Sequence, residues 1–207
     1  MLTWDVLNLI GTIAFALSGT IVAMEVKYDV IGAYVLGFVT AFGGGAVRNL
    51  FIGLPVTVLW DQEKLFIIAF VFITITYYLP SFILTAWEKW GVFFDAIGLG
   101  AFAIQGAMFA YDMSLPISAA IVAAALTGTG GGVIRDILAG RKPLFLRKEI
   151  YMLWTLLAGI PIGFGLIKTM PGYLIILSLI VILRMLSVQY GWSLPKRTLP
   201  NSFFKNK

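Results

Sequence analysis

The sequence predicts an all-α integral membrane protein with seven transmembrane helices, arranged as two inverted three-helix repeats plus a seventh helix. Three observations predict this fold. Of the 207 residues, 60% are hydrophobic and only 12% are charged, and the mean hydropathy is +0.95. Seven apolar stretches have about the 20 residues that a bilayer-spanning helix needs. The first part of the chain also recurs in the second.

The composition excludes several classes of protein. A soluble domain has about 25% charged residues, because charged side chains must cover its surface. We therefore exclude a soluble enzyme, a disordered chain and a nucleic-acid-binding domain, since the basic residues behind the +5 net charge lie in loops and in the tail. The chain has no Cys and no His, which removes disulfides, thiol and imidazole catalysis and most zinc or copper sites. We expect no cofactor and no metal other than a permeating ion.

The apolar stretches define a single transmembrane domain, residues 1–190. We expect the first repeat at about 4–86, the second at about 91–168 and the seventh helix at about 172–190. Residues 191–207 are expected to form a basic cytoplasmic tail that attracts anionic membrane lipid. The individual spans are expected at residues 4–24, 30–52, 64–86, 92–111, 115–139, 150–167 and 172–190.

The basic residues predict the orientation, because cytoplasmic loops carry an excess of Lys and Arg. The loops on the side of the N-terminus carry only Lys64 and Lys168. The other side carries Lys27, Lys89, Arg141, Lys142, Arg147, Lys148, Lys196, Arg197, Lys205 and Lys207. We therefore expect a multi-pass protein of the cell membrane with its N-terminus outside and its C-terminus in the cytoplasm.

An internal repeat relates the two halves of the chain. Residues 8–53 align without a gap to residues 95–140, and 15 of the 46 positions are identical. The densest match places 43–49, Gly-Gly-Gly-Ala-Val-Arg-Asn, on 130–136, Gly-Gly-Gly-Val-Ile-Arg-Asp. Since each repeat contains three spans, the second repeat begins on the opposite side of the membrane. The two repeats are therefore inverted, an architecture that places the functional site between them near the membrane midplane.

The glycine triplets mark the candidate site. One glycine costs a helix about 1 kcal/mol relative to alanine, so three in a row favour a bend or an unwound turn, whose free backbone groups must face the bundle interior. Close helix packing through small residues is the alternative. The six positions are Gly43, Gly44, Gly45, Gly130, Gly131 and Gly132.

Arg48 and Arg135 follow the triplets by about one turn. A charge at membrane depth costs roughly 2.5–3.5 kcal/mol, so each arginine either reaches to the membrane surface or lines an aqueous path. Asp136 could neutralise Arg135, whereas its repeat counterpart is the neutral Asn49. Broken helices with nearby arginines could serve ions of either sign.

Further polar residues are candidates for lining the path. A threonine in a membrane helix more often bonds its own backbone, so each hydroxyl alone is weak evidence. Asp95 lies near a span end, where an interfacial position is equally plausible, and for Arg184 we expect a contact with the interface or with a partner. The path-lining candidates are Thr40, Thr127, Thr129, Ser18 and Gln105.

Two inverted three-helix repeats, each with Gly-Gly-Gly-x-x-Arg-[Asn/Asp] in the second helix, plus a seventh helix, resemble the prokaryotic branch of the trimeric intracellular cation (TRIC) channel family. The resemblance covers residues 8–190, and its most specific part is residues 128–143. The first copy departs from it in having Leu54 and no basic pair before its proline.

The resemblance implies a homotrimer in which each protomer has a potassium-permeable pore between the repeats. The positions it carries over are the six triplet glycines with Arg48, Arg135 and Asp136. Some bacterial proteins with this repeated domain are assigned as glycine transporters, so the alternative is a transporter of small amino acids. The absence of His and Glu deep in the spans argues against proton coupling, but sodium coupling stays open.

Overall fold

The computed structural model describes residues 2–78, 88–147 and 150–195. In this part of the chain every regular element is a helix. The predicted end of the third span at 79–86, Lys148 and the tail from residue 196 lie outside the described residues. The elements are α1 (Leu2–Glu25), α2 (Val30–Ile52), η1 (Val56–Gln62), α3 (Glu63–Tyr78), α5 (Glu88–Asp112), α6 (Ile117–Leu138), α7 (Leu144–Arg147), η2 (Met152–Thr155), α8 (Leu156–Gly163) and α9 (Met170–Gln189).

Among the described residues, five helices are long and apolar enough to cross a membrane: α1, α2, α5, α6 and α9. They correspond to five of the seven predicted spans. The third helix of each repeat is shorter. The described part of α3 has 16 residues, and the predicted span at 150–167 is a 3-10 turn followed by the eight-residue α8. Gly165, with a φ of 68°, follows the end of α8, and the amides of Gly165 and Leu166 donate to the carbonyls of Ile162 and Pro161. This left-handed glycine cap ends the helix.

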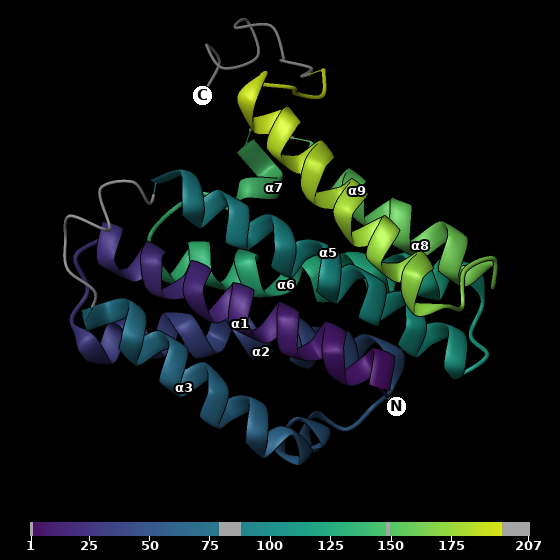
Figure 1. Ribbon diagram of the computed structural model, residues 1–207, viewed down its shortest axis with the longest axis horizontal. Helices are drawn as coiled ribbons and strands as arrows, with labels where there is room; N and C mark the ends of the chain where they lie inside the picture. Colours follow the sequence, from purple (N-terminus) through teal and green to yellow (C-terminus); the bar gives the residue numbers. More distant parts are fainter. Residues whose placement is uncertain (1, 79–87, 148–149, 196–207) are drawn as a thin grey trace, which may run out of the picture.

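The two repeats are packed against each other as the sequence repeat predicts (Figure 1). Within the first, α1 contacts α2 and α3; within the second, α5 contacts α6 and α8. Between the repeats, α1 contacts its counterpart α5, and α2 contacts its counterpart α6. We call the end of the bundle that carries the N-terminus, η1 and the α5–α6 turn the N-terminal face, and the opposite end, where α9 finishes, the C-terminal face.

Equivalent glycines end the second helix of each repeat. Gly53 follows α2 with a φ of 77°, and Gly140, its counterpart 87 residues later, follows α6 with a φ of 68°. These are left-handed conformations in which a side chain is unfavourable. The Leu54 amide then donates to the carbonyl of Asn49, and the Arg141 amide donates to that of Asp136. The same local chemistry therefore terminates both helices at opposite faces of the bundle.

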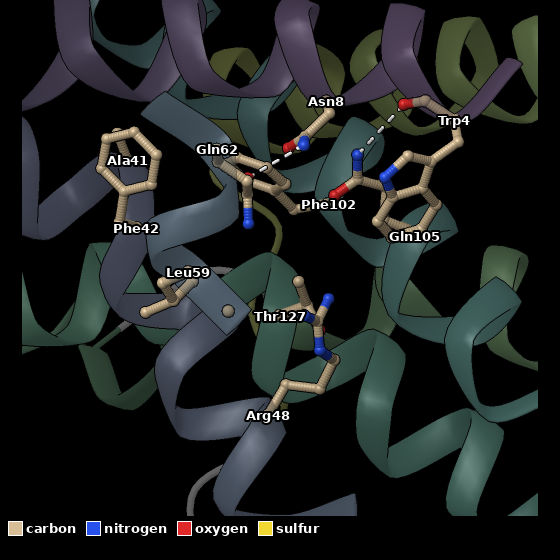
Figure 2. A pocket seen from close by; sticks show the side chains of 11 residues that line it. Trp4, Asn8, Ala41, Phe42, Arg48, Leu59, Gln62, Phe102, Gln105 and Thr127 are labelled. Atoms are coloured by element: carbon tan, nitrogen blue, oxygen red, sulfur yellow. Dashed lines mark hydrogen bonds between the residues drawn. The ribbon is translucent and has the colours of Figure 1, made fainter. Parts of the chain in front are cut away.

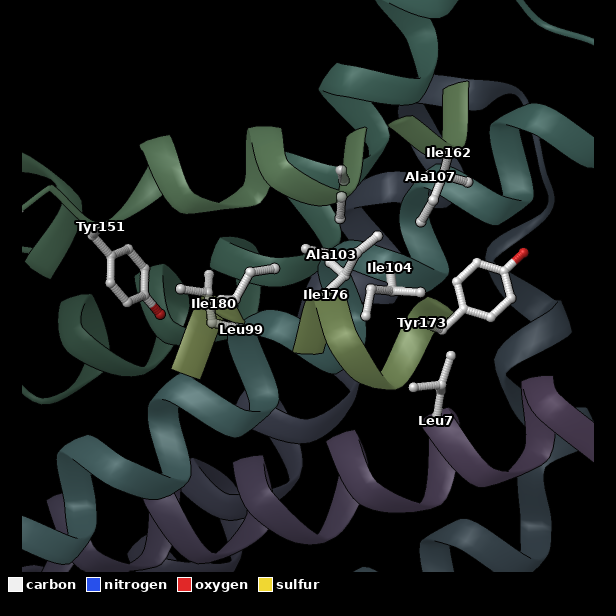
Figure 3. Close-up of a cluster of buried hydrophobic side chains, with 12 residues drawn as sticks. Leu7, Leu99, Ala103, Ile104, Ala107, Tyr151, Ile162, Tyr173, Ile176 and Ile180 are labelled. Atoms are coloured by element: carbon white, nitrogen blue, oxygen red, sulfur yellow. The ribbon is translucent and has the colours of Figure 1, made fainter. Parts of the chain in front are cut away.

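The added helix α9 packs mainly on α5 and extends the core of the second repeat. Tyr173, Ile176 and Ile180 from α9 meet Leu99 and Ile104 from α5 in one buried cluster, to which η2, α6, α8 and Leu7 of α1 also contribute (Figure 3). The opposite side of α9 exposes Ile175, Leu179 and Ile182, as expected for a helix that faces lipid.

Candidate functional site

The two glycine triplets lie against each other where α2 crosses α6. A Cβ added at Gly130 would lie 3.0 Å from the Cα of Gly44. A Cβ added at Gly44 would collide with the carbonyl oxygen of Thr127, and one at Gly131 with the carbonyl oxygen of Thr40. The triplets therefore lie at the contact between the two repeats.

The expectation of an unwound turn at the triplets is wrong. Both α2 and α6 are continuous α-helices through residues 43–45 and 130–132. The glycines permit a close approach of two backbones, which is the packing role that small residues have in membrane helices. The backbone amides and carbonyls of the triplets thus remain in helical hydrogen bonds and provide no freed groups to coordinate an ion.

The threonine hydroxyls near the triplets are also engaged by their own helices. Thr40, Thr127 and Thr129 each donate to the carbonyl oxygen four residues earlier, at 2.6, 2.6 and 2.7 Å. This is the local bonding expected of a threonine in a membrane helix. All three are buried, but of the three only Thr127 lines the cavity described below.

Arg135 is the centre of a buried charged cluster near the C-terminal end of α6. Its Nη1 donates to Asp95 Oδ1 of α5 and to Ser18 Oγ of α1, both at 2.7 Å. Its Nε donates to Asp136 Oδ1 at 3.0 Å. Arg135, Asp95 and Asp136 are each no more than 3% exposed. The guanidinium therefore does not reach the surface, and two carboxylates pair with it.

The seventh helix contributes a second arginine beside this cluster. Arg184 of α9 is buried, and its guanidinium lies over the ring of Tyr151, 4.8 Å from the centroid. A Cβ added at Gly132 would lie 3.2 Å from the hydroxyl oxygen of Tyr151 and 3.6 Å from Asp95 Oδ1. Arg184 is thus buried beside the residues that enclose Arg135 and is not exposed at the protein surface.

Arg48 occupies the equivalent place near the C-terminal end of α2, on the other side of the glycine crossing. It is 4% exposed. Its Nε and Nη2 donate to Asn49 Oδ1 at 3.0 and 2.8 Å, and its guanidinium carbon lies 3.8 Å from the centroid of the Phe109 ring. Asn49 is held in turn by a hydrogen bond from its Nδ2 to the carbonyl of Pro55 at 3.3 Å. Within the described residues, no carboxylate forms an ion pair with Arg48.

A small cavity lies beside Arg48, between the repeats and toward the N-terminal face (Figure 2). Its volume is about 20 Å³, which is room for about one water molecule. Asn8 and Gln62 lie across it and are joined by a hydrogen bond from Asn8 Nδ2 to Gln62 Oε1 at 2.9 Å. The cavity is lined by Trp4, Asn8, Ala41, Phe42, Gly45, Arg48, Leu59, Gln62, Phe102, Gln105 and Thr127.

A wider hollow of about 490 Å³ opens beside this cavity and shares Trp4 with it. The rings of Trp4 and Phe109 meet edge to face, with centroids 4.3 Å apart. On the other side of the cavity, Phe102 packs against Phe15, with centroids 5.2 Å apart, and Phe15 touches the glycine crossing at Gly131. Aromatic rings therefore border the small cavity toward the surface and toward the centre of the bundle.

The structure brings most of the predicted site residues into two groups. Arg135, Asp136 and Ser18 meet on the C-terminal side of the crossing, whereas Arg48, Asn49, Gln105 and Thr127 lie on the N-terminal side. Thr40 remains at the crossing, and Thr129 touches neither group. Sequence reasoning missed Asn8, Gln62, Tyr151 and the role of Asp95. Asn8 and Asp95 are repeat counterparts, and that signal could have placed both beside the arginines.

The comparison with protein families agrees with the internal repeat. The family model described as "Glycine transporter" matches residues 5–81 and again residues 92–167. The UPF0126 membrane protein YvgT of Bacillus subtilis is 53% identical over 197 residues, covering 95% of this chain and 98% of the relative. The UPF0126 inner membrane protein YadS of Escherichia coli K12 is 36% identical over 159 residues, covering 74% of each chain.

Solved structures with the same fold are TRIC channels. One, from work on conductance through TRIC cation channels, is 35% identical, with a TM-score of 0.78, covering 95% of this chain and 98% of the other. The TRIC orthologue from Rhodobacter sphaeroides is 25% identical, with a TM-score of 0.82, covering 92% and 100%. The match therefore includes both repeats and the seventh helix.

Proposed function

We propose that this chain is a potassium-permeable monovalent cation channel. The premise is that it belongs to the prokaryotic TRIC family, which is also the family of the matching glycine-transporter model. The family membership rests on matches that extend over both repeats and over most of the chain. The solved relatives are cation channels, so we infer a channel rather than an enzyme. Each protomer would contain its own pore.

We place the pore between the two repeats, along α2 and α6. One observation carries this proposal: buried polar side chains from both repeats follow one another on either side of the glycine crossing. Asn8 and Gln105 lie toward the N-terminal face, Thr127 lies nearer the crossing, and Asp95 and Asp136 lie beyond it. Polar groups at membrane depth are costly, and those that are present commonly mark an ion or substrate path. The two carboxylates favour cations on their side of the crossing.

We propose that the pore is closed in this arrangement. The cavity beside Arg48 holds about 20 Å³, whereas a permeating potassium ion needs a continuous line of water or oxygen ligands. Phe15, Phe102 and the crossing glycines fill the space between the two arginines. Conduction therefore requires α2 and α6, or the two phenylalanines between them, to move.

The alternative is a secondary transporter of small amino acids. The family name suggests it, and one structural feature favours it: Arg48 lacks a carboxylate partner among the described residues, so it could hold a substrate carboxylate. The small volume beside Arg48 weighs against this alternative, since glycine is several times larger than one water molecule. We therefore retain the channel as the proposed function.

We further propose that the protein is a homotrimer in the cell membrane, surrounded by lipid, with the N-terminal face outside. Trimeric assembly is supported by the solved relatives, which are trimeric cation channels. The orientation is supported by the excess of Lys and Arg in the loops and tail that the sequence assigns to the side of the C-terminus. The exposed apolar side of α9 is available for contact with lipid or with another protomer.

Reconstitution of the purified protein tests the proposed function. In a planar bilayer under a potassium gradient we expect single-channel steps of picoampere size that reverse near the potassium equilibrium potential. In liposomes we expect no saturable uptake of glycine. Saturable glycine uptake without such steps would instead establish the transporter.

The two arginines provide a second arm of the same experiment. A buried positive charge beside a pore opposes cation entry, so Arg48→Ala should raise the conductance or alter gating in a channel. In a carboxylate transporter the same substitution should abolish uptake. Arg135→Ala is the companion variant and removes the charge that Asp95 and Asp136 now neutralise.

A further inference from the structure

The two arginine clusters are built on the same plan but differ in charge. Around Arg135 lie Ser18, Asp95 and Asp136. In the 87-residue repeat, the counterparts of Ser18, Asp95 and Asp136 are Gln105, Asn8 and Asn49, respectively. These counterparts lie around Arg48. Asn49 does accept from Arg48, and Asn8 and Gln105 line the same cavity as Arg48. The first repeat thus has the arginine of this plan, but amides replace both carboxylates.

Among the residues that the structure describes, none gives Arg48 the counter-charge that Arg135 has. Arg135 has carboxylate oxygens at 2.7 and 3.0 Å. Arg48 is just as buried, yet the described residues offer it an amide oxygen and the face of Phe109. An aromatic ring and one amide offset only part of the desolvation of a guanidinium, because neither carries a full negative charge. An external anion would supply the missing charge.

The cavity beside Arg48 presents donors as well as positive charge. The hydrogen bonds to Asn49 use Nε and Nη2 of Arg48, and Nη1 makes no hydrogen bond to the described residues. The oxygen of Gln62 accepts from Asn8, so the amide group of Gln62 remains available to donate. Figure 2 shows Arg48 extending toward the level of Thr127, with Gln62 and Asn8 on the far side of the cavity. Such convergent donors select anions.

We propose that a small monovalent anion, with chloride as the example, binds in this cavity and acts as the exchangeable counter-ion of Arg48. The volume of about 20 Å³ suits a single small ion better than a carboxylate group with its attached carbon. The cavity adjoins the wider hollow on the N-terminal face, so the ion exchanges with the solution on that side. Binding itself does not depend on conduction. The effect of anion binding on conduction does rest on the proposed function. A bound anion cancels the positive charge of Arg48 beside the pore and so promotes cation entry.

Thermal unfolding of the purified protein in detergent tests the binding site. Chloride replaces gluconate at constant potassium concentration and constant ionic strength. At ten times its dissociation constant, a bound ligand should raise the melting temperature of a chain of this size by about 3–6 °C. In Asn8→Asp and in Asn49→Asp we expect this shift to be lost, because each variant supplies the carboxylate found in the other cluster. Gln189→Glu, at the exposed end of α9, makes the same charge change elsewhere and should keep the shift.

The outcomes separate the anion site from the proposed function. An equal chloride shift in the wild type and both aspartate variants, or none in any of them, would overturn the site. A shift with glycine or acetate and none with chloride would assign the cavity to carboxylates instead.

In bilayers, replacing chloride by gluconate on the N-terminal side should lower the potassium conductance of the wild type but not of Asn8→Asp. A chloride shift without potassium current would support the anion site and reject the channel.

Discussion

At the scale of the residue, the same motif arginine has two different environments. Arg48 and Arg135 occupy equivalent positions in the repeat and are equally buried, but only Arg135 has carboxylate partners among the described residues. The sequence predicted Asp136 as a partner of Arg135 because the two are adjacent. It did not predict Asp95, because a partner 40 residues away is identified only when α5 and α6 are placed side by side.

A substitution at Asp95 should show how much the stability of the protein depends on the buried ion pair between Asp95 and Arg135. Asp95→Asn keeps the shape but leaves the buried guanidinium with one carboxylate. Breaking a buried pair costs about 3 kcal/mol or more, so the melting temperature in detergent should fall by roughly 6–12 °C. The control is Glu25→Gln, which removes the surface ion pair with Arg141, whose partners are 36% and 30% exposed. That pair contributes at most about 1 kcal/mol. Equal losses in both variants would contradict the special role of the buried cluster.

At the scale of the element, the glycine triplets act through packing and leave α2 and α6 unbroken. The sequence analysis weighted the intrinsic cost of helical glycine, which is measured on helices exposed to water. In a membrane bundle an unwound turn would leave backbone groups unsatisfied, so continuous helices are favoured wherever packing permits them. The matched triplets permit a backbone contact at the crossing, and this tertiary contact could not be inferred from the propensity of either helix alone.

The positions within one triplet should respond differently to a methyl group. Gly44→Ala places a Cβ against the carbonyl of Thr127, so α2 and α6 must separate, at a cost of about 1–3 kcal/mol. Gly45→Ala is the matched control, since its Cβ would lie 3.6 Å from Leu59 Cδ2, an ordinary contact, and alanine favours the helix by up to about 1 kcal/mol. We expect reduced melting temperature and altered flux in Gly44→Ala and in Gly131→Ala. Wild-type flux and stability in both would mean that the crossing tolerates a wider separation.

At the scale of the whole molecule, the repeat in the sequence predicted two inverted three-helix units, and the structure adds that α1 packs on α5 and α2 on α6. Hydropathy located five long helices because their apolar runs are uninterrupted. Hydropathy overestimated the length of the helix that ends at Gly163, since apolar residues 164–167 continue the apolar run after the helix has stopped. It also missed η1, whose Gln62 reaches Asn8. Short, irregular segments of this kind are defined by contacts with the rest of the bundle, which hydropathy does not encode.

The orientation of the molecule in the membrane can be tested directly because the chain contains no cysteine. Asp61→Cys places a thiol at an exposed position in η1 on the N-terminal face, and Lys142→Cys places one at an exposed position after α6 on the C-terminal face. If the basic residues keep the C-terminal face in the cytoplasm, an impermeant maleimide applied to intact cells should label only Asp61→Cys. Permeabilised cells serve as the control, in which both variants should react. Labelling of Lys142→Cys from outside intact cells would reverse the orientation, and Arg135 with its carboxylates would then lie on the outer side of the crossing.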